Sequence, residues 1–273
     1  MIKNDKDRKG EYMGDLKFTN ELENPIFLRK LMAIAFVLIF FPIIFSCKSP
    51  VKENKSFLGE HKAVVLADQM FEAIGGKAEW CALKSLYIKA EHTEPQMVIP
   101  YQSEIWRGID RFELVIEQQN DSFHAKGVFN KYGGTIRYYD KRDTTRVLTK
   151  TQLEDEEFDH NHNIYVLLHE FGCNPENYRV AINEKERLTF YKDSVFICSF
   201  GLDDQSRPYL FFKPNPNGTV TGSTFTHWGT DEGLVHSAGG HPLDSSFVYR
   251  TGIWKPGTLP MKEMFGEKVF EIK

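Results

Sequence analysis

An amphipathic pattern opens the part of the chain that we expect to be globular. Between His61 and Ile74 the apolar residues recur three or four positions apart, which is the period of one helix face. They are Ala63, Leu66, Ala67, Met70, Phe71 and Ile74. Gly75 and Gly76 follow and favour a left-handed cap. We therefore predict a helix over 61–74, and a further helical turn over Lys77–Lys84.

From Ser85 onward the apolar residues alternate with polar ones. The segments SLYIKAEH, QSEIWRGIDRFELVIEQ, SFHAKGVFN and TIRYYDK are short and rich in aromatic and β-branched residues. Turn-forming triplets separate them, including Gly-Ile-Asp and Gln-Asn-Asp. This texture is typical of strands joined by tight turns. It predicts an antiparallel meander of about five strands.

The alternation stops between Leu153 and Tyr178. This stretch begins with acids, contains the apolar run Ile164–Leu168 and ends on Gly172 and Asn-Pro. Acids favour a helix N-terminus, so we predict a helix over 159–170. Strands resume with a hairpin turning near Lys192-Asp193 and another turn at residues 215–218. We interpret residues 227–244 as a glycine-rich polar loop, and SSFVYRTGIW and EKVFEIK as late strands.

The N-terminal region has the pattern of a secretory signal. Leu31–Phe45 holds fifteen residues without a charge, preceded by Arg29-Lys30. A membrane-spanning helix needs about 20 such residues, so the length favours a signal core over a span. Ile44-Phe45-Ser46-Cys47 resembles the lipobox of bacterial lipoproteins, which implies acylation at Cys47. The alternative is an uncleaved anchor helix, and in either case the chain is attached to a membrane.

These features divide the chain. Residues 1–27 are expected to be a gene-model extension or disordered, because signal n-regions are short. Residues 28–46 form the lipoprotein signal peptide, 47–60 the lipidated tether, and 61–273 one domain. Lys48 after the cysteine is compatible with passage to the outer membrane.

Composition narrows the function classes. The formal net charge is −4, and no basic stripe points to nucleic acid. The chain has four cysteines, without a Cys-x-x-Cys spacing. With Cys47 acylated, Cys81, Cys173 and Cys198 can form at most one disulfide, and the sequence leaves the pairing open.

A family resemblance rests on Ala67–His92, ADQMFEAIGGKAEWCALKSLYIKAEH. An amphipathic helix, Gly-Gly, a tryptophan and a small helix leading into an antiparallel meander resemble the LolA/LolB-like carriers of outer-membrane lipoproteins. The resemblance implies an α+β fold, in which a curved antiparallel sheet, an incomplete β-barrel, wraps around one or two helices. It also implies an apolar cavity for acyl chains. Beyond Gly201 the sequence departs from that pattern.

Aromatic side chains make up 14% of the chain and suggest where such a cavity lies. Aromatic residues line apolar cavities and also fill ordinary cores, so both interpretations stay open. The candidates for the cavity lining are Phe71, Trp80, Trp106, Phe112, Phe129, Tyr138, Phe190 and Phe211.

Two groups of histidines are candidates for a metal site, and the second group also for acid–base chemistry. His160, His162 and His169 with Glu170 lie in the predicted helix, where packing is the alternative. His227, His236 and His241 lie in the predicted loop, whose glycines could bring the imidazoles together. No nucleophile elbow, Walker loop or dinucleotide fingerprint is present.

The sequence thus predicts a lipid-anchored protein of a bacterial envelope, at the outer membrane. Its expected partners are the membrane, through acylated Cys47, and a lipid or lipoprotein acyl chain. We expect binding of a lipid or other hydrophobic ligand without catalysis and without a cofactor. The alternative is an envelope hydrolase or metal-binding protein that uses residues 227–244.

Overall fold

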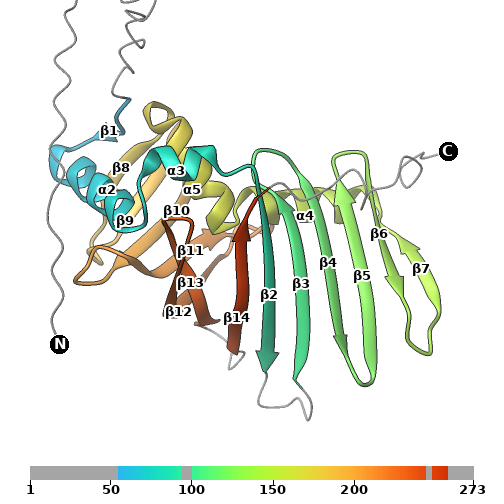
Figure 1. Ribbon diagram of the computed structural model, residues 1–273. Helices are drawn as coiled ribbons and strands as arrows, with labels where there is room; N and C mark the ends of the chain where they lie inside the picture. Colours follow the sequence, from blue (N-terminus) through green and yellow to red (C-terminus); the bar gives the residue numbers. More distant parts are fainter. Residues whose placement is uncertain (1–54, 94–99, 244–247, 258–273) are drawn as a thin grey trace, which may run out of the picture. The chain divides into compact units, whose positions relative to one another are not determined.

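A computed structural model describes residues 55–93, 100–243 and 248–257 (Figure 1). Chain contacts separate residues 1–53 from residues 54–273, and every described residue belongs to the second unit. The predicted signal peptide, Cys47 and the predicted strand EKVFEIK lie outside the described residues. Among the helices in the described part of the chain, none is both long and apolar enough to span a membrane.

One sheet of fourteen strands dominates this unit. Its strand order is β1-β8-β9-β10-β11-β12-β13-β14-β2-β3-β4-β5-β6-β7, and all neighbours are antiparallel except β1 and β8. The strands are β1 Leu58–Gly59, β2 Ser85–Thr93, β3 Tyr101–Gly108, β4 Glu113–Asn120, β5 Phe123–Asn130, β6 Gly133–Tyr138, β7 Thr144–Val147, β8 Arg179–Ile182, β9 Leu188–Lys192, β10 Val195–Leu202, β11 Pro208–Pro214, β12 Val220–Asp231, β13 Leu234–Pro242 and β14 Val248–Pro256.

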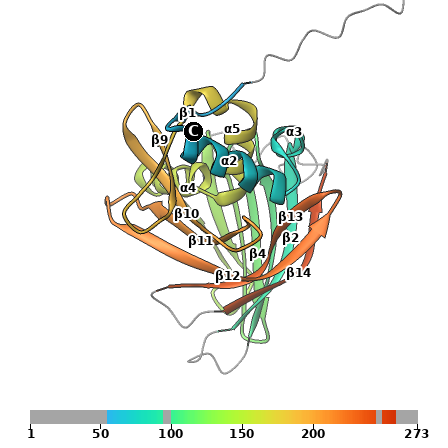
Figure 2. The same ribbon diagram turned by 90° about the vertical axis from the view of Figure 1, so that its left-hand side faces the viewer.

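The sheet is curved and unclosed. Figure 2 shows it bending from β10–β12 through β14 to β2 and β4, with the helices gathered toward one end of the strands. Its outer strands, β1 and β7, do not pair with each other. This architecture confirms the predicted α+β class, a curved sheet around helices.

The helix α2, His61–Ala73, has the predicted buried stripe, and α3, Lys77–Ala82, follows it. Gly75 separates them with φ of 109°. A Cβ at Gly75 would lie 2.4 Å from the carbonyl oxygen of Gly233, so a side chain does not fit there. The carbonyl of Ile74 also accepts a hydrogen bond from Trp80 Nε1 at 3.0 Å. These contacts fix the turn between the two helices.

The single helix predicted over 159–170 is wrong, because the structure has two helices. They are α4, Lys150–Asn161, and α5, Ile164–Cys173, followed by the short 3₁₀ helix η1, Pro175–Asn177. Thr149 and Gln152 form a capping box that starts α4 earlier than the acids alone suggested. The Asn163 side chain then accepts a hydrogen bond from the Tyr165 N–H and starts α5.

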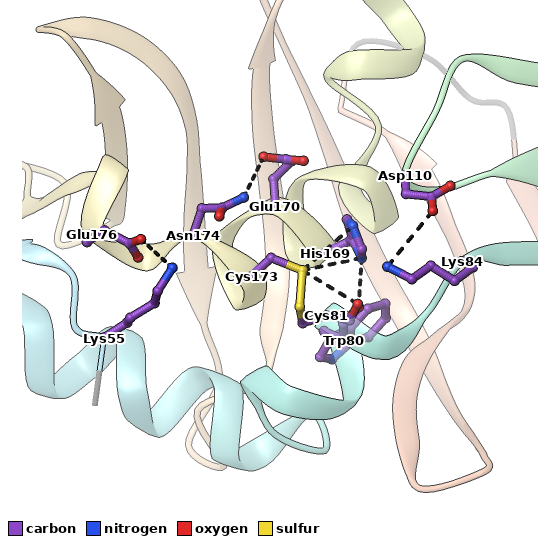
Figure 3. The surroundings of a disulfide bond; sticks show 10 residues. All are labelled: Lys55, Trp80, Cys81, Lys84, Asp110, His169, Glu170, Cys173, Asn174 and Glu176. Carbon is purple, nitrogen blue, oxygen red and sulfur yellow. Dashed lines mark hydrogen bonds and ion pairs between the residues drawn. A yellow bond between two sulfur atoms is a disulfide. The ribbon is translucent and has the colours of Figure 1, made fainter. Parts of the chain in front are cut away.

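A disulfide between Cys81 and Cys173 joins α3 to α5 (Figure 3). Gly172 admits this approach, since a Cβ there would lie 2.6 Å from the carbonyl oxygen of Lys77. Beside the bond, His169 Nδ1 lies 3.1 Å from the carbonyl oxygen of Trp80. Cys198 remains a free, buried thiol, and burial raises its pKa well above the usual value. The structure thereby settles the pairing that the sequence left open.

The loop predicted over 227–244 is also wrong. Most of this stretch belongs to the hairpin of β12 and β13. Its glycines make room for side chains of the neighbouring strand, because a Cβ at Gly229 would lie 2.7 Å from Cε1 of His236. The polar, glycine-rich composition reflects this close packing within a sheet.

Candidate functional site

Four isoleucines form a row across the first strands of the meander. Ile88 of β2 pairs with Ile105 of β3, which pairs with Ile116 of β4. Gly127 of β5 comes next in register, and Ile136 of β6 follows it. We call Ile88, Ile105, Ile116 and Ile136 the isoleucine row. All four side chains are only partly buried, so an apolar strip keeps some contact with water.

The row lies on the inner face of the sheet, the face that the helices cover. Residues two apart on a strand share a face. Leu86, two positions before Ile88, is fully buried in the core that includes the helices. Arg107, two positions after Ile105, contacts His160 of α4. The isoleucine row is therefore the next layer of the inner face beyond these buried residues.

The opposite, outer face of the same strands carries charge. The row next to the isoleucines consists of Lys89, Glu104, Glu117, Lys126 and Arg137 in register. Lys89 Nζ lies 2.8 Å from Glu104, and Lys126 Nζ lies 3.3 Å from Glu117. This alternation of charge and isoleucine distinguishes a solvent face from an apolar face.

Gly127 leaves a gap in the isoleucine row, and the Phe129 ring fills it. A Cβ at Gly127 would lie 2.5 Å from Cζ of Phe129. Phe129 packs with Phe112 and Leu114 in a small buried cluster, against which Ile105, Ile116 and Ile136 pack, together with Leu148 and Leu153. The isoleucines of β3, β4 and β6 are thus in contact with one another's apolar neighbours through this buried cluster.

Arg107 interrupts the buried layer next to the row. It pairs with Leu86 on one side and Leu114 on the other, and it is 9% exposed. Its Nη1 lies 3.1 Å from Nδ1 of His160, which is 2% exposed. Because guanidinium nitrogens only donate, Nδ1 accepts and the imidazole proton is on Nε2. That tautomer suits a hydrogen bond to the Arg111 backbone.

The electrostatics of the pair follow from burial. Burial and the Arg107 charge lower the pKa of His160 to about 3, so the imidazole is neutral at pH 7. Burial lowers the pKa of Arg107 to about 10, which leaves the guanidinium charged. A buried cation therefore has a neutral side chain as its contact partner.

His160 also lines a cleft of about 290 Å³. The apolar lining of the cleft includes Ile109, Phe112, Val166 and Leu167. Charged residues of both signs also line it, namely Asp110, Arg111, Glu170 and Lys192. The cleft brings together the β3–β4 turn, the junction of α4 and α5, and strands β9 and β10. His160 is thus shared between the cleft and the inner face of the sheet.

The aromatic residues predicted to line a cavity lie in several places. Phe71, Trp80, Phe190 and Phe211 belong to the main buried core, and Phe112 and Phe129 to the small cluster beside the isoleucine row.

The other two of these residues lie on strands that carry the isoleucine row, and Tyr138, two residues after Ile136, shares its inner face. Trp106 is on the outer face, where Lys126 Nζ lies 5.9 Å from its ring centre. Tyr138 has the Arg142 guanidinium 3.8 Å from its ring centre. Sequence reasoning missed the isoleucine row and Arg107, although the alternation in SLYIKAEH and SEIWRGID was the signal for them.

Each histidine of the predicted helix contacts a specific partner in the folded chain. His160 bonds to Arg107, His162 Nδ1 lies 2.9 Å from the Phe158 carbonyl oxygen, and His169 contacts Trp80. Burial lowers the pKa of His162 as well.

The histidines of residues 227–244 are spread along the β12–β13 hairpin. His227 is exposed, while buried His236 stacks on Trp254 at 4.2 Å and lies 3.1 Å from Asp231. His241 Nδ1 lies 3.0 Å from the Pro242 carbonyl oxygen. Within residues 55–93, 100–243 and 248–257, no group of three or more metal-ligating side chains converges.

Comparisons with known proteins complete this description. No family model matches the chain, and no curated protein matches it. Among solved structures, a DUF1329 family protein from Desulfovibrio piger has a TM-score of 0.44 and 6% identity, over 76% of this chain and 98% of that one. A domain from Vibrio parahaemolyticus described as an outer membrane lipoprotein-sorting protein has a TM-score of 0.42 and 10% identity, over 76% of this chain and 97% of that one.

Proposed function

We propose that this chain is a lipid-anchored protein of the bacterial envelope that binds a lipid or other hydrophobic ligand along the isoleucine row, without catalysis. One observation carries the proposal. The row is apolar and partly exposed, on the inner face of a sheet whose neighbouring layer is packed. Apolar surface that stays accessible to water often marks a binding site in a soluble protein.

The dimensions of the row suit an extended hydrocarbon chain. Neighbouring strands are about 4.8 Å apart, so the four steps from Ile88 to Ile136 span about 19 Å. A ligand lying across the strands would contact all four isoleucines and cover their remaining exposed surface. Each buried methylene contributes about 0.8 kcal/mol, so a long acyl chain gains most from such a site.

The membrane attachment rests on the sequence. The fifteen-residue apolar core and the lipobox at Ile44–Cys47 favour acylation of Cys47. Lys48 after the cysteine is compatible with an outer-membrane location. The disulfide between Cys81 and Cys173 agrees with an oxidising compartment, because disulfides persist there and are rare in the cytosol.

Native mass spectrometry tests the proposed binding. The chain from Lys48 onward contains the whole compact unit and would be purified from bacterial cells, then extracted with solvent. We expect a co-purifying lipid mass that is lost on extraction and regained on incubation with a lipid mixture. An unoccupied protein that takes up nothing from the mixture would contradict the proposal.

A matched pair of variants locates the site. Ile116→Ser removes an apolar side chain from the inner face, and Val128→Ser removes one from the outer face of the adjacent strand. Both side chains are partly exposed, so neither change empties a closed core. We expect Ile116→Ser to lower lipid occupancy and Val128→Ser to leave it unchanged. Equal occupancy in the two variants would place the ligand elsewhere.

A further inference from the structure

Within the described part of the chain, no carboxylate is in hydrogen-bond or ion-pair contact with Arg107. Among the described residues, His160 is the hydrogen-bond partner of its guanidinium. Asp159 acts on it only through space and is held by Lys213 at 2.6 Å. Glu156 also acts through space, and burial raises the pKa of that carboxyl, which disfavours its charged form.

Such an arrangement is costly without a further partner. A guanidinium has five N–H donors, and the pair with His160 uses one of them. Taking a cation out of water costs several kcal/mol unless an anion and further hydrogen bonds compensate. None of the described side-chain atoms that are fully buried without a hydrogen-bond partner belongs to Arg107. The remaining Arg107 nitrogens therefore keep access to solvent, and so to a ligand.

The position of Arg107 relates it to the isoleucine row. It is two residues from Ile105 on the same strand and on the same face. In the adjacent strands, Leu86 precedes Ile88 and Leu114 precedes Ile116 by the same two residues. The guanidinium thus belongs to the layer next to the row, between it and α4. A ligand whose chain lies on the row from Ile105 toward Ile136 can place its head against Arg107.

We propose that Arg107 binds the anionic head of the hydrophobic ligand, which makes the ligand class an anionic amphiphile with a carboxylate or phosphate head. This inference rests on the proposed binding of a hydrophobic ligand along the isoleucine row. The planar guanidinium matches both heads, because each can accept two parallel N–H bonds. The neutral His160 holds Arg107 from the other side without competing for its charge.

The experiment compares ligands with the same chain and different heads. Decanoate, decyl phosphate and decanol would be titrated calorimetrically into the lipid-free chain from Lys48 onward. Hydrogen bonds to a charged group contribute about 1.5–3 kcal/mol, so we expect the better of the two anions to bind about 10- to 100-fold more tightly than decanol. Whether decanoate or decyl phosphate is preferred identifies the head.

Variants of Arg107 assign the preference to this side chain. Arg107→Met should reduce the ratio of anion to alcohol affinity to about 1, while decanol binding stays within about twofold. Arg107→Lys keeps the charge but cannot donate two parallel hydrogen bonds, so it should give an intermediate ratio. The control Arg137→Met removes an arginine from the outer face and should leave the ratio unchanged.

The outcomes are distinct. Equal binding of anions and alcohol by the wild-type chain would overturn the inference and leave the proposed function standing. A ratio that persists in Arg107→Met would also overturn it, even if that variant unfolds more readily, because Arg107 would then only position α4. If none of the three ligands binds, the proposed function falls and the inference falls with it.

Discussion

The side chains on the inner face of the sheet are buried to different degrees in its two halves. On β9 and β10, Leu188, Phe190 and Phe200 are all 0% exposed. On β3 and β4, Ile105 and Ile116 have the same alternating placement but remain partly exposed. Helices explain the difference, since α2 packs on β8 and β9, whereas α4 contacts β5 and β6.

The comparison separates two uses of one sequence pattern. Alternating apolar residues make a closed core where helices cover them and an accessible strip where they do not. We call the first region the closed core. Its fully buried large side chains include Met70, Phe71, Trp80, Phe171, Phe190 and Phe200. The isoleucine row is the accessible strip, and this contrast predicts different responses to mutation.

The largest expected effect comes from emptying the closed core. The Phe190 ring stacks on Phe171 with ring centres 4.2 Å apart, so Phe190→Ala should lower the free energy of unfolding by about 3–5 kcal/mol. Ile116→Ala should cost only about 1–2 kcal/mol, because part of its side chain already contacts water. Urea denaturation of both variants measures the difference. Equal losses would mean that the row is as closed as the core.

The next effect concerns the disulfide, which belongs to the closed half. Replacing Cys81 and Cys173 together by alanine should cost about 2–5 kcal/mol of unfolding free energy. Denaturation midpoints with and without a reducing agent give the measurement. The wild-type midpoint should fall on reduction, while that of the double variant should stay constant. A double variant as stable as the oxidised wild type would refute a stabilising role.

A smaller, pH-dependent effect arises at the border of the two halves. The pKa of His160 is about 3 in the folded chain and about 6.5 in an unfolded one, so the unfolded chain binds more protons below pH 6.5. The free energy of unfolding should therefore be constant above that pH. It should fall as the pH drops toward 3, by at most about 1.4 kcal/mol per unit for this group.

The check is a series of denaturation curves between pH 7.5 and 5. His160→Gln should flatten part of the decline, because His160 alone lowers the free energy of unfolding by about 2 kcal/mol between pH 7.5 and pH 5 in the wild-type chain. Burial also lowers the pKa of His92, to about 4, which adds a decline of the same sign in both proteins. Identical slopes in the variant and the wild type would show that His160 is not buried in its neutral form.

Much of the fold could be predicted from local sequence patterns. The helix over 61–74 and the glycines after it appear almost as expected, and so do the turns near residues 193 and 217. Alternation and turn residues act over a few positions, so a single sequence reveals them. The division of 159–170 was missed because the capping residues Thr149 and Asn163, and not the acids, set where the two helices begin.

For the candidate site, the sequence could predict the type of ligand but not the residues that would bind it. Aromatic composition suggested an apolar ligand, but the structure places those rings in two buried clusters, on the outer face and beside Arg142. The isoleucine row exists because the five strands β2 to β6 align in one register, and register depends on pairing between distant segments. Likewise, nothing near Arg107 in the sequence indicates His160, which is 53 residues away.

The order of strands in the sheet has a consequence for how the chain reaches this structure. The strands β2 to β6 each pair with the next one along the chain, so their hairpins can form as soon as they are synthesised. The helix α2 precedes them, yet it packs on β8 and β9, which follow more than 100 residues later. We expect the apolar stripe of α2 to stay exposed to water until β8 and β9 have formed. This early helix is therefore the segment that we expect a chaperone to bind.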